Sequence, residues 1–107
     1  MPKFLIEASY EGVGAKGLAK EGGSSRRALV ADLIKKAGGN MECFYYAFGP
    51  SDVYAIFDMP DASSAIALSL AVNSSGAVKL KTIPLISVEE MDAAAKKPVA
   101  YRPPGAS

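Results

Sequence analysis

The stretch MECFYYAFGPSDVYAIFDM, residues 41–59, contains two strand-like apolar runs joined by a tight reversal. The runs cover 41–48 and 53–59, and the four residues between them, 49–52, include a glycine, a proline and an aspartate. These residue types favour turns, because glycine tolerates positive φ, proline fixes φ and aspartate bonds its own backbone. The stretch therefore predicts a β-hairpin in the middle of the chain.

Helical and strand-like patterns continue outward from this hairpin on both sides. Apolar residues at helical spacing predict one helix that is capped by Ser24 or Ser25 and a second that is capped by Asp61. Outer strands are expected over 4–10 and 77–86. The order β-α-β-β-α-β is typical of the split βαβ arrangement. We therefore expect an α+β fold, a ferredoxin-like sandwich whose antiparallel four-stranded sheet carries its helices on one face.

The C-terminal part of the chain carries its own signals. Ser87 and Glu90 form a capping-box pattern, which predicts a short helix that ends near 96–97. The tail over 98–107 holds three of the seven prolines and is expected to be extended. Pro84 places the last strand at a sheet edge, because proline cannot donate to a strand ladder. We expect a single domain over 1–97 followed by this tail.

A glycine-rich segment over 11–23 holds five of the ten glycines, which predicts a loop with at most a short turn at 16–20. Its Gly12-Val-Gly14-Ala-Lys-Gly17 pattern matches the dinucleotide fingerprint. That function requires a helix start and an acidic residue at the end of the second strand, yet Glu42 stands at its beginning. We expect a flexible loop and no cofactor.

Composition excludes several function classes. The 107 residues include 12 basic and 11 acidic side chains, so the net charge of +1 lacks the electrostatic footprint of a nucleic-acid-binding protein. There is no histidine and a single cysteine, Cys43, which leaves neither a cysteine-based metal site nor the commonest general base. No apolar stretch reaches bilayer length, and no leader pattern is visible. We expect a cytoplasmic protein with no metal, no nucleic-acid partner and no membrane partner.

Six residues are candidates for ligand contacts. Two guanidiniums at a helix start suit an anion, although both can also point to water. Aromatic rings and carboxylates near the hairpin suit a small organic molecule, although an aspartate in the reversal can simply bond its turn and one at a strand end can remain solvated. The candidates are Arg26, Arg27, Tyr46, Asp52, Tyr54 and Asp58.

The two hairpin strands are apolar or aromatic on both faces. In a two-layer fold only one sheet face meets helices, so the other would expose these rings unless something covers it. We therefore expect a homo-oligomer that forms through its sheet faces.

The hairpin region resembles the GYD domain family, which is named for a Gly-x-Tyr-Asp signature between two strands. The resemblance rests on FYYAF at 44–48, GPSDVYAI at 49–56 and LSLAVNSSGAV at 68–78, and it extends from about 3 to 90. It implies a ferredoxin-like fold of the kind that assembles into dimeric α/β barrels. Ser51 occupies the position of the signature tyrosine, and the family provides no catalytic residue to transfer.

Three functions are compatible with these observations. The first is a homo-oligomeric small-molecule-binding or regulatory module. The second is a cofactor-free enzyme of the dimeric α/β barrel type, oxygenase-like or isomerase-like, that would use Asp58 or a tyrosine. The third is a structural assembly unit without a ligand.

Overall fold

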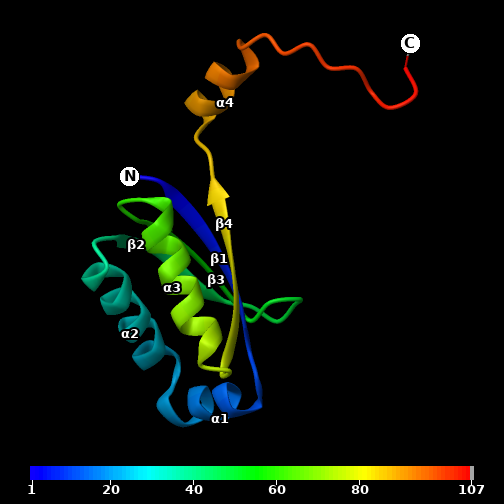
Figure 1. Cartoon of the computed structure of the whole chain (residues 1–107). Coiled ribbons are helices and arrows are strands. Elements are labelled where there is room, and N and C mark those ends of the chain that lie inside the picture. Colours follow the sequence, from blue (N-terminus) through cyan, green and yellow to red (C-terminus); the bar gives the residue numbers. More distant parts are fainter. Residues whose placement is uncertain (107) are drawn as a thin grey trace.

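The computed structural model describes residues 1–106, which form four strands and four helices. Figure 1 shows their arrangement. In chain order the elements are β1 (Lys3–Tyr10), α1 (Gly12–Glu21), α2 (Gly23–Lys36), β2 (Asn40–Tyr46), β3 (Val53–Asp58), α3 (Ala62–Ser74), β4 (Val78–Leu85) and α4 (Val88–Ala95).

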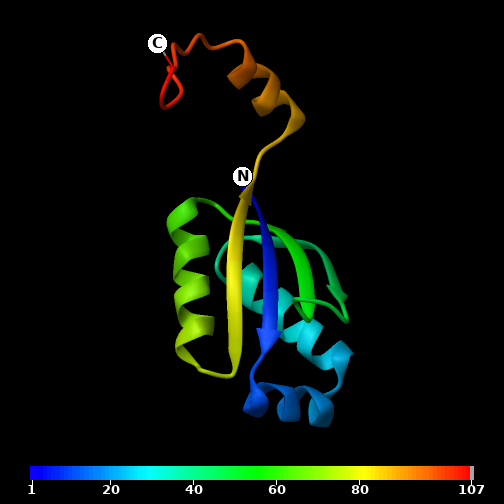
Figure 2. The same cartoon turned by 90° about the vertical axis from the view of Figure 1, so that its right-hand side faces the viewer.

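The strands form one antiparallel sheet in the order β2-β3-β1-β4. Helices α2 and α3 both lie on one face of the sheet and leave the other face bare, as the two views in Figures 1 and 2 show. This confirms the predicted ferredoxin-like sandwich. β4 is an edge strand, as Pro84 indicated, because Pro84 pairs with Phe4 on β1 and no strand lies beyond it.

The core lies between the sheet and the two helices. Strand residues alternate, so that Phe4, Ile6 and Ala8 on β1 are buried while their neighbours are only half-buried. The same alternation buries Val53, Ala55 and Phe57 on β3, and the Phe4 and Phe57 rings lie 5.6 Å apart. The helices contribute Ile34, Ala65 and Leu68 to the same cluster.

A β-bulge in β2 changes the faces that the sequence predicted. Strict alternation would place Met41 with Cys43, but Met41 pairs with Phe57 and Cys43 pairs with Ile56, with a register shift between them. The extra residue is Glu42, and a bulge places two residues opposite one partner. Met41 therefore packs against the core together with Phe44, while Cys43 and Tyr45 belong to the bare face.

The glycine-rich segment is a helix, α1, and the loop prediction was wrong. The segment can pack tightly because it carries no bulky side chain: a Cβ at Gly14 would overlap the Ala77 carbonyl oxygen. The same oxygen accepts a hydrogen bond from the Glu11 N–H at 2.9 Å, which anchors the helix start. Glycine costs helix stability, so these tertiary contacts outweigh its intrinsic preference.

Two of the three predicted helix caps are formed. Asp61 caps α3 by accepting from the Ser64 N–H at 2.8 Å, and the Ser87–Glu90 capping box is formed. The exception is α2, for which we predicted a serine cap. Its N-cap is Gly22, with φ of +86°, because α1 and α2 are joined by a single residue in a backbone conformation that glycine adopts without strain.

Residues 86–106, which we call the C-terminal arm, leave the sheet beyond β4 and stand apart from it (Figures 1 and 2). The helix α4 has no buried residue, and the molecule measures 59 × 32 × 23 Å. Val88, Met91 and Tyr101 on the arm are exposed. The predicted short helix and extended tail are present over the described residues, and Ser107 lies outside them.

Among residues 1–106, no helix combines the length and the apolar character that crossing a bilayer requires.

Candidate functional site

One pocket lies where α1 and the start of α2 meet the end of β2 and the hairpin turn. Its volume is about 410 Å³, within the range of roughly 300–1,000 Å³ that is usual for small-molecule sites. The walls are mostly aromatic and aliphatic, with one carboxylate. The lining residues are Tyr10, Ala15, Leu18, Gly23, Tyr46, Ala47, Phe48 and Asp52.

Asp52 is held in place by three backbone contacts. Its Oδ2 accepts from the Tyr10 N–H at 2.9 Å, its own N–H donates to the Ala8 oxygen at 2.8 Å, and its carbonyl accepts from the Ala47 N–H at 2.8 Å. The sequence also allowed an aspartate that bonds only its own turn, but Asp52 ties the hairpin turn to the end of β1. The carboxylate is therefore a fixed negative group in the pocket wall.

Tyr46, which also lines the pocket, is held by its hydroxyl and by its ring. Its hydroxyl donates to the Gly23 carbonyl at 2.9 Å, and its ring packs edge-on against Phe44 at 5.3 Å. A Cβ at Gly23 would stand 3.0 Å from the Tyr46 ring, so the glycine is what lets the ring lie across the start of α2. The aromatic wall is therefore positioned before any ligand arrives.

Tyr10 joins this pocket to a smaller hollow of about 180 Å³ under α1. Tyr10 and Leu18 line both, and Arg26 and Glu21 line only the smaller one. Burial raises the pKa of the Tyr10 phenol, the Tyr46 hydroxyl raises it further, and the Arg26 guanidinium partly opposes both. The phenol therefore stays neutral at physiological pH.

The two neighbouring arginines have separate surroundings. Arg26 is half-buried and reaches the hollow beside Tyr10, while Arg27 is exposed and lines a different hollow between α2 and β2, next to Glu42 and Cys43. One step along a helix turns the side chain by about 100°, which is why adjacent residues do not share a site.

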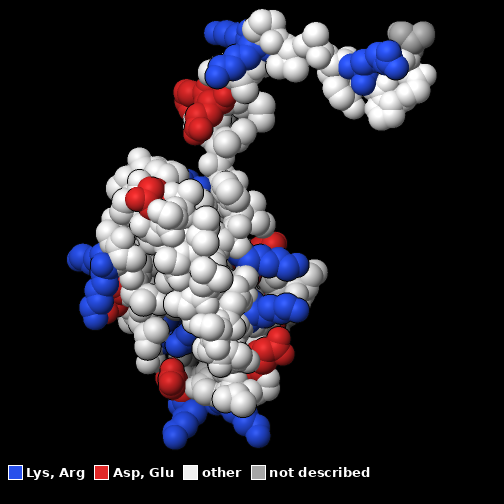
Figure 3. All heavy atoms as spheres, in the orientation of Figure 1, with Lys and Arg blue, Asp and Glu red and all other residues white. Residues whose placement is uncertain are grey.

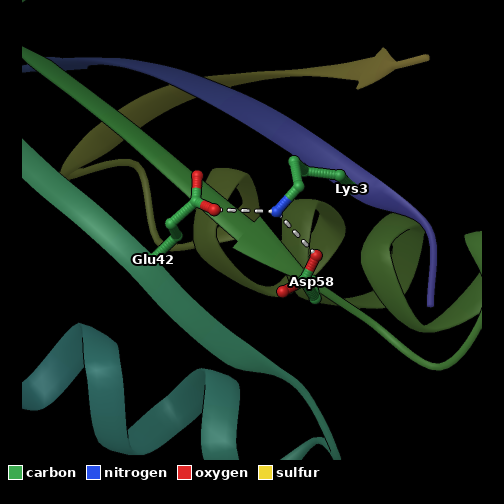
Figure 4. Close-up of polar contacts among 3 residues, drawn as sticks. All are labelled: Lys3, Glu42 and Asp58. Carbon is green, nitrogen blue, oxygen red and sulfur yellow. Dashed lines mark hydrogen bonds and ion pairs between the residues drawn. The ribbon is translucent and has the colours of Figure 1, made fainter. Parts of the chain in front are cut away.

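The structure places Tyr54 and Asp58 on the bare sheet face, apart from the pocket. Tyr54 pairs with Glu7 and Tyr45. Asp58 forms an ion pair with Lys3 at 3.1 Å, and the same ammonium lies 3.0 Å from Glu42, as Figure 4 shows. These hydrogen bonds, the one to Glu42 first, raise the pKa of Lys3.

Of the six candidates, Tyr46, Asp52 and Arg26 line the two adjacent hollows beside Tyr10, and the other three lie elsewhere. The central residue, Tyr10, was missed. The signal for it was weak but present, because Tyr10 ends β1 on the same face as Ala8 and the glycine-rich segment follows it at once. A side chain at position 10 must therefore lie close to the structure that the glycine-rich segment forms.

One face of the folded domain, the face that carries α3, is poor in charge (Figure 3). Figure 3 shows basic and acidic side chains around its rim, and a wide uncharged area over α3, whose sequence contains no ionisable residue. Within the described part of the chain, no three of its cysteine, aspartate and glutamate side chains are grouped as metal ligands would be.

A comparison with models of protein families finds a match to the one described as GYD domain, over residues 4–95. No curated protein and no solved structure matches the chain.

Proposed function

The chain belongs to the GYD domain family, and from that premise we propose that it is a homo-oligomeric small-molecule-binding module. The observation that carries the proposal is the pocket between α1 and the hairpin. Tyr46 and Asp52 are fixed by hydrogen bonds on two of its sides, and Tyr10 lies between them and Arg26. A largely apolar cavity with a few oriented polar groups is the arrangement that small-molecule sites use.

The pocket needs no rearrangement to be formed, which favours binding. Ordering flexible side chains costs free energy when a ligand binds, and a prepositioned wall avoids part of that cost. The exposed ring of Phe48 lies at the hairpin, at the margin of the cavity, where it can contact a ligand without first leaving the core.

The bare sheet face supports the self-association part of the proposal. Its residues fall into rows across the strands, and the central row is apolar: Cys43, Ile56, Leu5 and Ile83. Charged residues flank this row, with Glu7 beside Lys81 on one side and Lys3 beside Asp58 on the other. An apolar centre with a polar rim is the usual anatomy of a protein interface.

A second copy of the chain fits this face because the rows contain charges of both signs. Each flanking row contains one acidic and one basic residue, so a partner related by a two-fold axis can place groups of opposite charge across the interface. The proposed assembly is therefore a dimer whose sheets pack face to face, which leaves the pocket on the helix-covered side of each subunit open to solvent.

Binding can be tested by thermal shift with a library of small metabolites, because a ligand that binds only the native state raises the melting temperature. We expect hits with the wild type and with Leu29→Trp, which adds bulk on the exposed side of α2. Leu18→Trp fills the pocket and should abolish the shift. If no compound of any class shifts the wild type, the binding proposal is wrong.

Self-association can be tested by sedimentation equilibrium. Ile56→Lys places a charge in the central row of the bare face and should convert the dimer to a monomer, whereas Leu29→Lys on α2 should remain dimeric. A wild type that sediments as a monomer at micromolar concentration would refute the assembly. A dimer that binds no ligand would instead identify the chain as a structural assembly unit.

A further inference from the structure

We propose that the ligand is a planar aromatic carboxylate that carries a hydroxyl or amino group at the opposite end of its ring, an inference that rests on the proposed binding function. Three features of the site lead to this class: an apolar middle, the Arg26 guanidinium at one end and the fixed Asp52 carboxylate at the other.

The apolar middle selects a flat ring. Tyr46 and Phe48 contribute aromatic surfaces, and Leu18 and Ala15 on α1 contribute aliphatic surface from the helix above. Rings pack well against aromatic and aliphatic walls, with an energy that follows the apolar area removed from water. The gap between α1 and the hairpin therefore suits one aromatic ring better than a branched polar molecule.

The cationic end is Arg26. The three ion pairs among residues 1–106 involve Lys3 and Lys36, so no carboxylate of these residues lies within 4 Å of the Arg26 guanidinium, which faces the Tyr10 phenol. Glu21 lines the same hollow. A guanidinium presents five N–H donors in a fixed fork that matches a carboxylate. A half-buried fork beside a neutral phenol is therefore open to an anionic group from a ligand.

The anionic end is Asp52. Its Oδ2 is occupied by the Tyr10 N–H, and no hydrogen bond to Oδ1 is formed within residues 1–106. A carboxylate on the ligand would be repelled here, while a hydroxyl or amino hydrogen would be accepted. The site therefore has a direction, with the acid of the ligand toward Arg26 and its donor group toward Asp52.

The size of the two hollows agrees with this orientation. The larger one, about 410 Å³, contains the ring and the donor group, and the smaller one, about 180 Å³, takes the carboxylate beyond Tyr10. Because Tyr10 and Leu18 line both, the two hollows are adjacent at these side chains, and the proposed ligand would contact both of them. Glu21 lies in the same hollow as Arg26, and its negative charge weakens the attraction between Arg26 and the carboxylate of the ligand. Removal of this charge should therefore increase the affinity.

The test is an NMR titration of the full-length chain with 4-hydroxybenzoate, 4-aminobenzoate, benzoate and the neutral 4-hydroxybenzamide. We expect the two substituted acids to bind more tightly than benzoate, and all three acids to bind more tightly than the amide. The amide signals of Tyr10, Gly23 and Phe48 should shift, because these residues line the pocket.

Charge variants then test the direction of the site. Arg26→Gln should weaken the substituted acids by about tenfold or more, as the loss of one charge-assisted hydrogen bond implies. Arg27→Gln is the matched control and should leave the affinity unchanged. Arg26→Lys should keep part of it, and Glu21→Gln should tighten it by about twofold to fivefold, as removal of a nearby like charge at a partly exposed site does.

The outcomes separate this inference from the proposed function. If the neutral amide binds as tightly as the acids and Arg26→Gln changes nothing, the ligand class is wrong while the binding module stands. If acids bind but Arg27→Gln weakens them as much as Arg26→Gln, the assignment of the cationic end is wrong. If no ring compound binds and the metabolite library gives no shift, both proposals fall.

Discussion

The two faces of the sheet differ in polarity: the covered face is almost entirely apolar, whereas the bare face combines one apolar row with rows that contain charged residues. On the covered face, the three cross-strand rows contain Met41, Phe57, Phe4 and Pro84, then Phe44, Ala55, Ile6 and Thr82, then Tyr46, Val53, Ala8 and Leu80. Thr82 is the only aliphatic hydroxyl among them, and it forms a hydrogen bond with Ser69 on α3.

On the bare face, one apolar row is bordered by rows that contain Glu7, Lys81, Lys3 and Asp58. The covered face therefore folds the chain, and the bare face leaves one strip of apolar surface available for a partner. Successive side chains of a strand point to opposite faces of the sheet. The same strands can therefore build a core on one face and offer a surface for a partner on the other.

The largest loss of stability is expected from a substitution at Phe57, which lies on the covered face and is 0% exposed. Phe57→Ala should lower the free energy of unfolding by about 3–5 kcal/mol, since it leaves a cavity in a packed core. Chemical denaturation measures this, and the loss should not depend on protein concentration. Ile56→Ala, one residue earlier on the bare face, should give a smaller loss, which grows with concentration if the proposed dimer buries this side chain.

A second prediction concerns α1, which closes the end of the covered face. Gly14→Ala should destabilise the protein by about 1–3 kcal/mol, as overpacking does, because its Cβ would meet the Ala77 carbonyl. Gly17→Ala, three residues on, has nothing within 4 Å of its Cβ and should stabilise by about 0.5–1 kcal/mol. Equal effects of the two variants in thermal melts would contradict the packing of α1.

A third, smaller effect concerns the pH dependence of Tyr10 at the same end. Its pKa is raised above 10.0 mainly by burial, so the native state keeps this proton to higher pH than the unfolded chain does. The stability that results is present below pH 10 and is lost as pH rises through the raised pKa. Denaturation from pH 9 to 11 should show a steeper decline for the wild type than for Tyr10→Phe.

The smallest effect is expected at Lys3 on the bare face. Its two ion pairs are partly exposed, and surface pairs contribute little to stability. Lys3→Met should leave the melting temperature almost unchanged when it is measured in the Ile56→Lys background, which is designed to prevent the proposed dimer from forming. A loss comparable to that of Phe57→Ala would mean that the bare face also holds the fold together.

Periodicity and turn chemistry predicted the strands, the order of the elements, the edge position of Pro84 and two of the three helix caps. They did not predict α1, because the cost of its glycines is offset by a contact with Ala77, about 60 residues away along the chain. The bulge at Glu42 was missed for the same reason, since strand patterns assume a register that only the partner strand can interrupt.

The candidate site shows the same division. Asp52 and Tyr46 could be predicted because the hairpin itself positions them. Arg26 and Arg27 could not be told apart, since which of two adjacent side chains faces inward depends on the rotation of α2 against Tyr10. Tyr54 and Asp58 share the hairpin with the pocket residues, but the pleat directs them to the other face.

The C-terminal arm also changes how the molecule moves through solution. A compact chain of this length has a radius of gyration of about 13 Å, whereas this one has 17.3 Å. A single subunit will therefore diffuse more slowly, and elute earlier from a gel-filtration column, than a spherical protein of equal mass. Its elution volume alone would imitate that of a heavier particle, so light scattering is the appropriate way to count its subunits.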